Sequence, residues 1–396
     1  MAVPLLDLRL QYAQVRDEVR GRLDALLESQ QFILGAPVLE LEGAVRDYTG
    51  CGHAVGTSSG TDALLAILMA MGIGRGDAVI TSPYTFFATA GCIYRVGAEP
   101  VFVDIDAATY NMDPARLEEC LRKKCRSGPD GRLVTAAGNR VRSIMPVHLF
   151  GCVCDMDRIN ALASEFDLVV IEDAAQAIGA DYPSSSGKTL RAGAIGAASY
   201  FSFFPSKNLG AYGDAGMATC GDADLAEQIR LMRNHGMGAQ YHHEKVGGNF
   251  RLDAMQAVII SAKLPHLDAW HAGRRRNAEL YREEFRRLGL LDRITLPSEP
   301  YAGSGVSNHH IYHQYVVRVP DRDRAREKLT EDGIGCAVYY PLPLHLQECF
   351  APLGHGVGDF PESEKAASES LALPIYPELS GEQIHEVALA LARAID

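Results

Sequence analysis

Two ionisable residues, Asp173 and Lys207, each follow an apolar run that we expect to form a buried strand. Asp173 ends the run VVIED, where burying a carboxylate is costly unless a cationic group meets it. Lys207 comes 34 residues later, behind ASYFSFFPS and ahead of a glycine-rich turn. Taken singly, Asp173 is as well explained by a helix cap, and Lys207 by a surface charge. Together, a carboxylate and an amine at the ends of neighbouring strands are suited to Schiff-base chemistry.

A candidate anion site precedes this pair along the chain. The segment SSGTDAL (58–64) places small and hydroxyl residues directly before an apolar helix, where backbone N–H groups and the helix dipole favour an anion. A plain helix N-cap is the simpler explanation of this segment alone. The full order is a phosphate cradle, an aromatic segment, Asp173, Ser202 and Lys207. This order is expected of an enzyme that uses pyridoxal 5'-phosphate, which needs a phosphate anchor, a stacking face, a ring-nitrogen partner and an amine.

The elements that must position these residues alternate between strands and helices from about residue 50 to 220. Most predicted strands are near-continuous apolar runs, as expected when both faces of a sheet are covered. The predicted strands are 78–81, 100–104, 144–147, 168–172, 198–203 and 216–219. The predicted helices between them are 61–71, 87–96, 114–123 and 156–165. We therefore predict an α/β fold with a mixed, mostly parallel sheet between helices, and a ligand at the carboxyl ends of its strands. Glu172 is expected to point away from Asp173, as a structural residue.

The remaining segments predict two domains. Residues 125–139 and 183–193 are rich in Gly, Ser and charge and are expected to form surface loops or hairpins. A long helical period covers 252–288, followed by strand-like 311–319 and 337–340 and helical 322–331 and 380–395. We expect a large α/β domain with an N-terminal helical segment (1–265) and a smaller α+β domain that includes the connecting helix (266–396).

Composition excludes several classes of function. The 396 residues carry 38 Lys and Arg against 50 Asp and Glu, a net charge of −12 that disfavours nucleic acid as a partner. The densest basic run, 274–276, is expected to be a solvated helix face. No signal peptide is visible, and the longest apolar stretch, 63–74, is too short to cross a bilayer, so we expect a cytoplasmic protein without membrane contact. The nine cysteines lack a paired zinc-site spacing, so Cys152 and Cys154 are expected to be reduced thiols and no metal is expected.

The chain closely resembles the DegT/DnrJ/StrS family of pyridoxal-phosphate-dependent nucleotide-sugar aminotransferases over nearly its whole length. The resemblance lies in several motifs, which together are far more specific than any one of them. They are QFILGAPVLELE, SSGTDAL, SPYTFFATA, PVFVDID, IEDAAQA, FFPSKNLGAYGDAG, GGNFRLDAMQA, YYPLPLHLQ and LPIYPEL. The resemblance implies an aspartate-aminotransferase-like fold (pyridoxal-phosphate fold type I) and a homodimer with shared active sites at the subunit boundary.

The resemblance also implies a role for each matching residue. Lys207 would bind the cofactor's aldehyde, and Asp173 would hold the protonated ring nitrogen. The other implied cofactor contacts are Gly60, Thr61 and Ser202 at the phosphate, Phe86 against the ring, Gln176 near the ring hydroxyl, and Asn249 reaching the phosphate from the partner subunit. Candidate sugar contacts are Tyr339, Tyr340, His345, His242 and His243, for which packing or an exposed loop is an equally good explanation.

The expected reaction is transfer of an amino group from L-glutamate to a keto-sugar linked to a nucleoside diphosphate. The motif VGGNFRLD is more similar to that of family members that act at C-3, on UDP-3-keto-N-acetylglucosamine-type or dTDP-3-keto-6-deoxyhexose substrates. Alternatives are a C-4 keto-sugar, a keto-cyclitol, or a regulatory protein of the same fold that has lost turnover. Members that dehydrate sugars carry His in place of the lysine, which Lys207 argues against. The expected pathway is amino-sugar biosynthesis, with lipopolysaccharide, lipid A, other glycans or an antibiotic as possible products.

Overall fold

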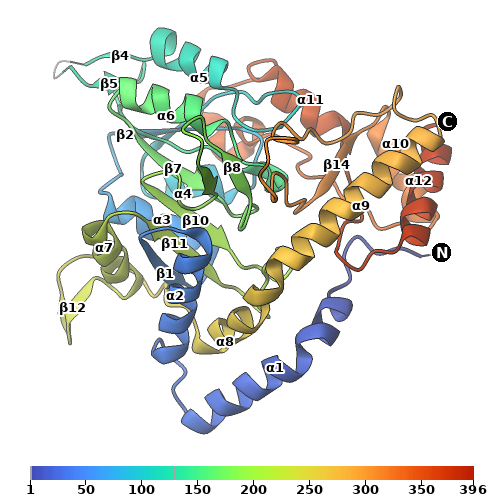
Figure 1. Ribbon diagram of the computed structural model, residues 1–396. Coiled ribbons are helices and arrows are strands. Elements are labelled where there is room, and N and C mark those ends of the chain that lie inside the picture. Colours follow the sequence, from blue (N-terminus) through green and yellow to red (C-terminus); the bar gives the residue numbers. More distant parts are fainter. Residues whose placement is uncertain (1, 129–130) are drawn as a thin grey trace.

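The computed structural model describes residues 2–128 and 131–396. Its main feature is a mixed sheet with the strand order β1-β11-β10-β7-β6-β2-β3, to which β4 and β5 are attached beside β6 (Figure 1). The strands of this sheet are β1 (His53–Thr57), β2 (Asp77–Thr81), β3 (Glu99–Phe102), β4 (Arg126–Ser127), β5 (Leu133–Val134), β6 (Arg140–Ile144), β7 (Val169–Asp173), β10 (Ala198–Ser202) and β11 (Gly216–Cys220). Strands β10, β7, β6, β2 and β3 run parallel, whereas β11 is antiparallel to both of its neighbours. The predicted α/β fold with a mostly parallel sheet is confirmed.

Helices cover both faces of the sheet. One face packs against α3, α4 and α7, and the other against α2, α5, α6 and α8. The helices are α1 (Leu8–Ser29), α2 (Ala36–Thr49), α3 (Gly60–Ala70), α4 (Ala88–Arg95), α5 (Pro114–Glu119), α6 (Met156–Glu165), α7 (Ala223–Arg233), α8 (Ala254–Lys263), α9 (Leu267–Arg287), α10 (Arg322–Glu331), α11 (Pro361–Glu369) and α12 (Gly381–Ile395). Short 3₁₀ turns cover Leu149–Gly151, Leu264–His266, Leu344–Leu346 and Glu348–Leu353, and a π-turn, Cys120–Lys124, extends α5. Strands β7 and β10 are buried between the two helical layers, and the carboxyl end of each is where a polar residue can reach an open space.

The C-terminal part builds a second apolar core beyond the long helix α9, which crosses the molecule diagonally in Figure 1. This core joins α9, α10 and α12 to the antiparallel pair β14 (Tyr315–Arg318) and β15 (Ser370–Leu373). It also takes in Val3, which pairs with Ile334, so the two chain ends lie on the same side of the molecule. The division at about residue 265 stays a prediction.

Both segments that were expected to be loops or hairpins contain short hairpins. Strand β8 (Asp181–Pro183), which ends where the second segment begins, pairs with β9 (Thr189–Arg191) inside it, and β4 pairs with β5 within the first. Residues 129 and 130 of the first segment lie outside the described residues. A further hairpin, β12 (Met237–Ala239) with β13 (His242–His243), stands out from the body at the left of Figure 1.

Three predictions about elements need correction, and two buried strands were missed. The strand expected at 144–147 is β6, which begins at Arg140 and ends at Ile144. Its start was placed too late because RVRSI alternates charged or polar residues with apolar ones instead of forming an apolar run. Strands β1 and β15 were not predicted at all. Residues 337–340 are not a strand; only Ala337 pairs, with Ala372, while the next residues bend. The basic run 274–276 is a solvated face only in part: Arg276 is exposed, but Arg274 is buried and donates to the carbonyls of Tyr312 and Ile375.

Candidate active site

A cavity of about 480 Å³ opens where β7 and β10 end, beside the first turn of α3. Its size falls within the roughly 300–1,000 Å³ typical of small-molecule sites, and its position is the one expected for a ligand of a parallel sheet. Nine of the residues singled out from the sequence line it: Gly60, Thr61, Phe86, Asp173, Gln176, Ser202, Lys207, Tyr339 and Tyr340. The fold therefore gathers segments more than 250 residues apart around one space.

Lys207 lies in a tight turn that follows β10. The main-chain N–H of Lys207 donates to the Phe204 carbonyl at 2.8 Å. The two sides of the turn lie so close that a Cβ on Gly210 would be 2.3 Å from the Pro205 carbonyl oxygen. Burial lowers the pKa of Lys207 to about 8, with Asp173 partly opposing that shift. The amine is therefore far more available as a free base near neutral pH than an ordinary lysine.

Asp173 is the last residue of β7 and is held by two donors. The Thr89 hydroxyl on α4 donates to Oδ2 at 2.6 Å, and the Ala175 N–H donates to Oδ1 at 3.2 Å. The carboxylate is almost fully buried and lines the cavity together with Lys207. Burial and this carboxylate together hold the pKa of neighbouring Tyr200 well above its ordinary value. A cationic group inside the cavity would meet this buried carboxyl group directly.

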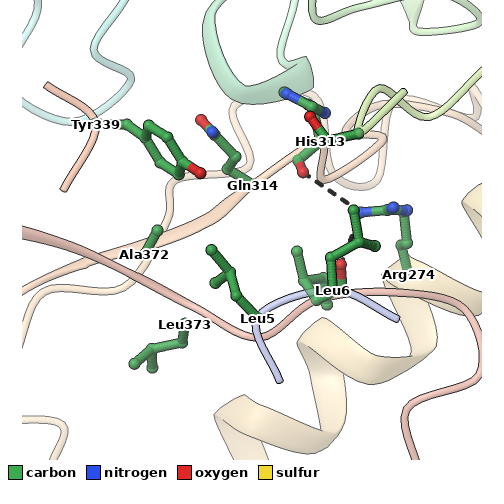
Figure 2. Close-up of a pocket in the computed structure, with 10 residues that line it drawn as sticks. Leu5, Leu6, Arg274, His313, Gln314, Tyr339, Ala372 and Leu373 are labelled. Carbon is green, nitrogen blue, oxygen red and sulfur yellow. Dashed lines mark hydrogen bonds between the residues drawn. The ribbon is translucent and has the colours of Figure 1, made fainter. Parts of the chain in front are cut away.

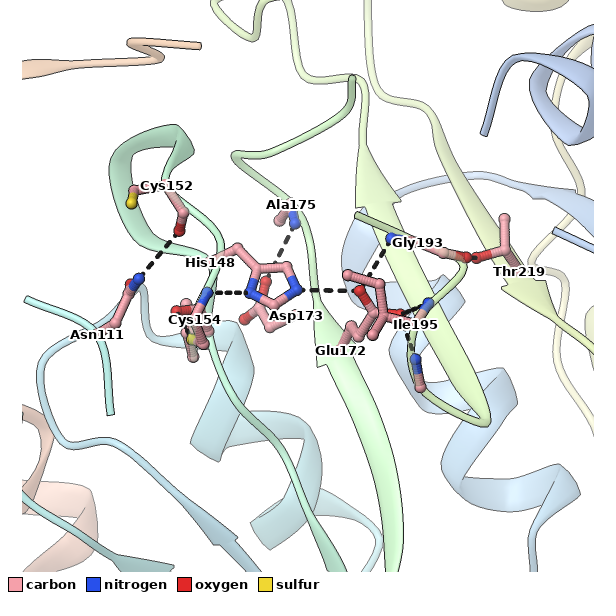
Figure 3. A network of polar contacts seen from close by, with 12 residues as sticks. Asn111, His148, Cys152, Cys154, Glu172, Asp173, Ala175, Gly193, Ile195 and Thr219 are labelled. Atoms are coloured by element: carbon pink, nitrogen blue, oxygen red, sulfur yellow. Dashed lines mark hydrogen bonds and ion pairs between the residues drawn. The ribbon is translucent and has the colours of Figure 1, made fainter. Parts of the chain in front are cut away.

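Glu172 points the other way, as predicted, and fastens the strand that carries Asp173 (Figure 3). Its carboxylate accepts from the N–H groups of Gly193, Ile195 and Gly196 at 2.7–3.0 Å. It also lies 3.0 Å from Nε2 of His148, whose Nδ1 accepts from the Cys154 N–H. Nε2 is therefore the protonated ring nitrogen, and it donates to Glu172. Glu172 and His148 are fully buried, and the network ties two neighbouring loops to β7.

We expect Glu172→Ala to lower the free energy of unfolding by roughly 3–5 kcal/mol, because it leaves three main-chain donors and His148 without their acceptor. Urea denaturation followed by circular dichroism measures this change. Glu165→Ala is the matched control, since it breaks only an exposed pair with Arg122 and should leave the midpoint nearly unchanged. Equal midpoints for Glu172→Ala and the wild type would contradict the structural role.

The opposite end of the cavity is suited to an anion. Helix α3 begins at Gly60, and its N-cap Ser59 accepts from the Asp62 N–H. Backbone segments meet closely here, since a Cβ on Gly60 would lie 2.9 Å from the Ser202 Cβ, and one on Gly216 would overlap Ser59. The first-turn N–H groups and the hydroxyls of Thr61 and Ser202 are thus presented to the cavity.

Aromatic and amide groups form the walls between the two ends. The Phe86 ring is 57% exposed and lines the cavity from the segment before α4. Gln176 is held at both ends: its Oε1 accepts from the Phe150 N–H at 2.7 Å, and its Nε2 donates to the Tyr340 hydroxyl at 3.0 Å. Tyr339 lines the same wall.

Four residues singled out from the sequence do not line this cavity. Asn249, His242 and His243 are exposed, the two histidines in the β12–β13 hairpin. His345 is buried elsewhere, where its Nε2 lies 3.1 Å from Glu364 and its ring packs edge-on against Phe360. Packing therefore explains His345 without a ligand.

Several cavity residues escaped prediction from the sequence. Thr89, Tyr200, His313 and Gln314 line the cavity with Lys207. The hydroxyls of Thr85 and Thr89, which stand four residues apart around the start of α4, are the sequence signal that could have suggested a donor to Asp173. His313 and Gln314 precede β14 and gave no comparable signal.

The residues present fit pyridoxal phosphate. A narrow anion cradle, whose backbone segments pack too closely for a side chain on Gly60 or Gly216, stands at one end, and a buried carboxylate and an amine stand beyond it. These are the groups required for the phosphate, ring nitrogen and aldehyde of that cofactor. In residues 2–128 and 131–396 no His, Cys, Asp and Glu cluster is suited to a metal ion, and no helix is both long and apolar enough to cross a membrane.

The fold and the lysine–aspartate cavity are those of a lysine-dependent transferase of amino groups. The chain belongs to the DegT/DnrJ/EryC1/StrS aminotransferase family, whose sequence model matches residues 13–392. The prediction of an aminotransferase is confirmed.

Three similar proteins illustrate the relationship. The chain is 46% identical over 392 residues (99% of this chain, 98% of the relative) to a "pleiotropic regulatory protein" of Geobacillus stearothermophilus. It is 42% identical over 394 residues (100% and 98%) to UDP-N-acetyl-3-dehydro-alpha-D-glucosamine 3-aminotransferase of Acidithiobacillus ferrooxidans. The structure of NtdA from Bacillus subtilis with bound cofactor PMP superposes with a TM-score of 0.86 at 29% identity, covering 100% of this chain and 85% of that one.

The lowered pKa of Lys207 predicts how cofactor capture depends on pH. Because only the free amine attacks an aldehyde, the rate at which cofactor-free protein gains its visible absorption band should rise about tenfold per pH unit below pH 8. Above about pH 8 it should level off. Stopped-flow absorbance after mixing with pyridoxal phosphate measures it. A rate that keeps rising to pH 10, as an unperturbed lysine would give, would show that burial does not tune Lys207.

Proposed function

We propose that this protein transfers the amino group of L-glutamate to the C-3 keto group of a sugar linked to a nucleoside diphosphate, with pyridoxal phosphate as its cofactor. The observation that carries the proposal is the joint placement of Lys207, Asp173 and the α3 anion cradle around one cavity. The regiochemistry is supported by the name of the Acidithiobacillus relative, which acts on a UDP-linked 3-keto sugar.

Each residue would have a separate role in holding the cofactor. The first turn of α3, Thr61 and Ser202 would bind its phosphate, and Phe86 would lie against its ring. Asp173, already fixed by Thr89, would keep the ring nitrogen protonated. Pyridoxal phosphate, when bound, supplies an electron sink for the carbon that loses its proton.

Lys207 would then carry the proton. As a free amine it would take the proton from Cα of glutamate in the first half of the reaction, and it would deliver a proton to C-3 of the sugar in the second half. This requires an amine that is basic yet free of its proton near neutral pH, as a pKa of about 8 provides. The buried walls around it limit competing reactions with water.

A second subunit would complete the site. Asn249 is exposed and does not line the cavity of its own chain, so it is free to reach the phosphate held by a partner. Phe86 and Phe204 line the cavity yet are 57% and 51% exposed, which leaves that wall open to cover by another chain. We therefore propose a homodimer with shared sites.

A regulatory role without turnover is the second candidate, because the Geobacillus relative carries a regulatory name. That role needs neither a buried amine nor a buried carboxylate, and both groups are costly to bury. Their retention here favours catalysis.

A single-turnover experiment tests the proposal. The protein is converted to its amino form with glutamate, freed of glutamate, and mixed separately with UDP- and dTDP-linked 3-keto and 4-keto sugars. Return of the visible band with one 3-keto sugar is expected and would also identify the nucleotide. Return of the band only with a 4-keto sugar would overturn the C-3 assignment. No return with any of the four sugars would contradict a nucleotide-sugar substrate and favour a keto-cyclitol.

A further inference from the structure

One wall of the cavity is formed by His313 and Gln314, which the proposed cofactor contacts leave without a role. The His313 main chain is firmly held, since its N–H donates to the Phe150 carbonyl at 2.9 Å. Its carbonyl accepts from the buried guanidinium of Arg274, as Figure 2 shows. The ring therefore has a fixed place at the cavity wall.

The hydrogen bonds around the His313 ring determine which nitrogen carries the hydrogen. Nδ1 lies 3.0 Å from Oδ1 of Asn208, and Nδ2 of Asn208 donates to the Ile311 carbonyl at 3.1 Å. This second bond orients the amide so that its oxygen faces the ring. Because an amide oxygen only accepts, Nδ1 is protonated and Nε2 keeps its lone pair.

Asn208, which fixes the protonation of the His313 ring, directly follows Lys207 in the same turn. Burial, the charge of Lys207 and that of Arg274 hold the pKa of His313 well below its ordinary value, so the ring is neutral. Nε2 has no hydrogen-bond partner within the described part of the chain. The other ionisable groups around the pair are Asp173, Asp214, Tyr200, Tyr339 and Tyr340, all of which line the cavity.

We infer that His313 is a positioning residue for Lys207: its Nε2, kept as an acceptor by Asn208, receives an N–H of the free Lys207 amine and turns the amine's lone pair toward the reacting carbon. The inference rests on the proposed function, in which Lys207 works as a free amine. An amine held by one N–H has fewer orientations to lose before proton transfer.

This arrangement has a consequence that does not depend on turnover. A neutral acceptor stabilises the ammonium form of Lys207 more than the amine, because hydrogen bonds from charged donors are the stronger ones. Removing the acceptor therefore lowers the pKa of Lys207.

The test uses cofactor-free protein, so that it reports on Lys207 itself. Acetylation of Lys207 by acetic anhydride is followed against pH by peptide mass spectrometry. His313→Leu should move the midpoint down by roughly one pH unit, whereas His313→Gln, which returns an amide oxygen near the Nε2 position, should recover most of it. His310→Leu is the matched control, because His310 is equally buried but does not line the large cavity.

The same variants are then loaded with cofactor. His313→Leu should slow proton transfer from glutamate by about 10- to 100-fold with little change in KM, and His310→Leu should not. An unchanged acetylation midpoint in His313→Leu, or an equal shift in His310→Leu, would overturn the inference. If His313→Leu does not fold, ¹⁵N chemical shifts of the wild-type ring decide: a proton on Nδ1 alone supports the inference, and a proton on Nε2 refutes it. Because acetylation needs no sugar, failure of the proposed substrate leaves this test intact.

Discussion

Lys207→Ala is expected to reduce amino-group transfer by roughly 10⁴-fold or more, because it removes both the amine that binds the cofactor and the base that moves the proton. The variant should also lose the visible band of lysine-bound cofactor while keeping its fold, since only the aliphatic stem and one amine leave the cavity wall. Initial rates and absorbance spectra of the purified variant measure both effects.

Lys263→Met is the matched control for this experiment. Lys263 is also buried, and burial likewise lowers its pKa to about 8. Its amine, however, donates to the Gly210 carbonyl at 2.6 Å and does not line the cavity. We expect this variant to be less stable but to keep its visible band. If Lys207→Ala kept the band and Lys263→Met lost it, the assignment of the reactive lysine would be wrong.

Asp173→Asn is the change with the second largest expected effect. The amide keeps the size of the side chain and can still accept from Thr89, but it no longer stabilises a protonated ring nitrogen. Loss of one charge from a buried pair costs about 3–5 kcal/mol, which corresponds to roughly 10²–10⁴-fold in rate. Because Lys207 is unchanged, the variant should still capture cofactor, so the loss should appear in kcat.

Asp181→Asn controls for the removal of a buried carboxylate as such. Asp181 accepts from Arg191 at 3.0 Å, away from the cavity, and its loss should lower stability but not kcat. Wild-type kcat in Asp173→Asn would contradict the role given to Asp173.

The sequence predicted best those buried elements that form long apolar runs, whereas the buried strands β1 and β15 were missed. Strands β7 and β10 and helix α3 lie within one residue of the predicted bounds, because fully buried elements leave continuous apolar runs. The predicted position of β6 was too far along the chain because Arg142 interrupts its apolar sequence. Arg142 donates to the Met71 carbonyl and pairs with Asp77. Tyr339 and Tyr340 resemble strand residues in sequence, but the chain bends there and turns them into the cavity.

The candidate site shows the same division. Asp173 and Lys207 were visible because a charge at the end of an apolar strand is costly and needs an explanation. Arg274 and His313 were not, since their burial depends on carbonyls and an amide brought together from distant segments. The sequence around Arg274 or His313 does not indicate which distant residues will contact them in the fold.

The most direct test of the account follows the nitrogen atom itself. Purified protein is incubated with ¹⁵N-labelled L-glutamate and a UDP-linked or dTDP-linked 3-keto sugar, and the product is analysed by mass spectrometry and NMR. The account predicts ¹⁵N bonded to C-3 of the nucleotide sugar with the wild type and none with Lys207→Ala. Label at C-3 with Lys207→Ala, or no labelled sugar from wild-type protein that has bound its cofactor, would contradict it.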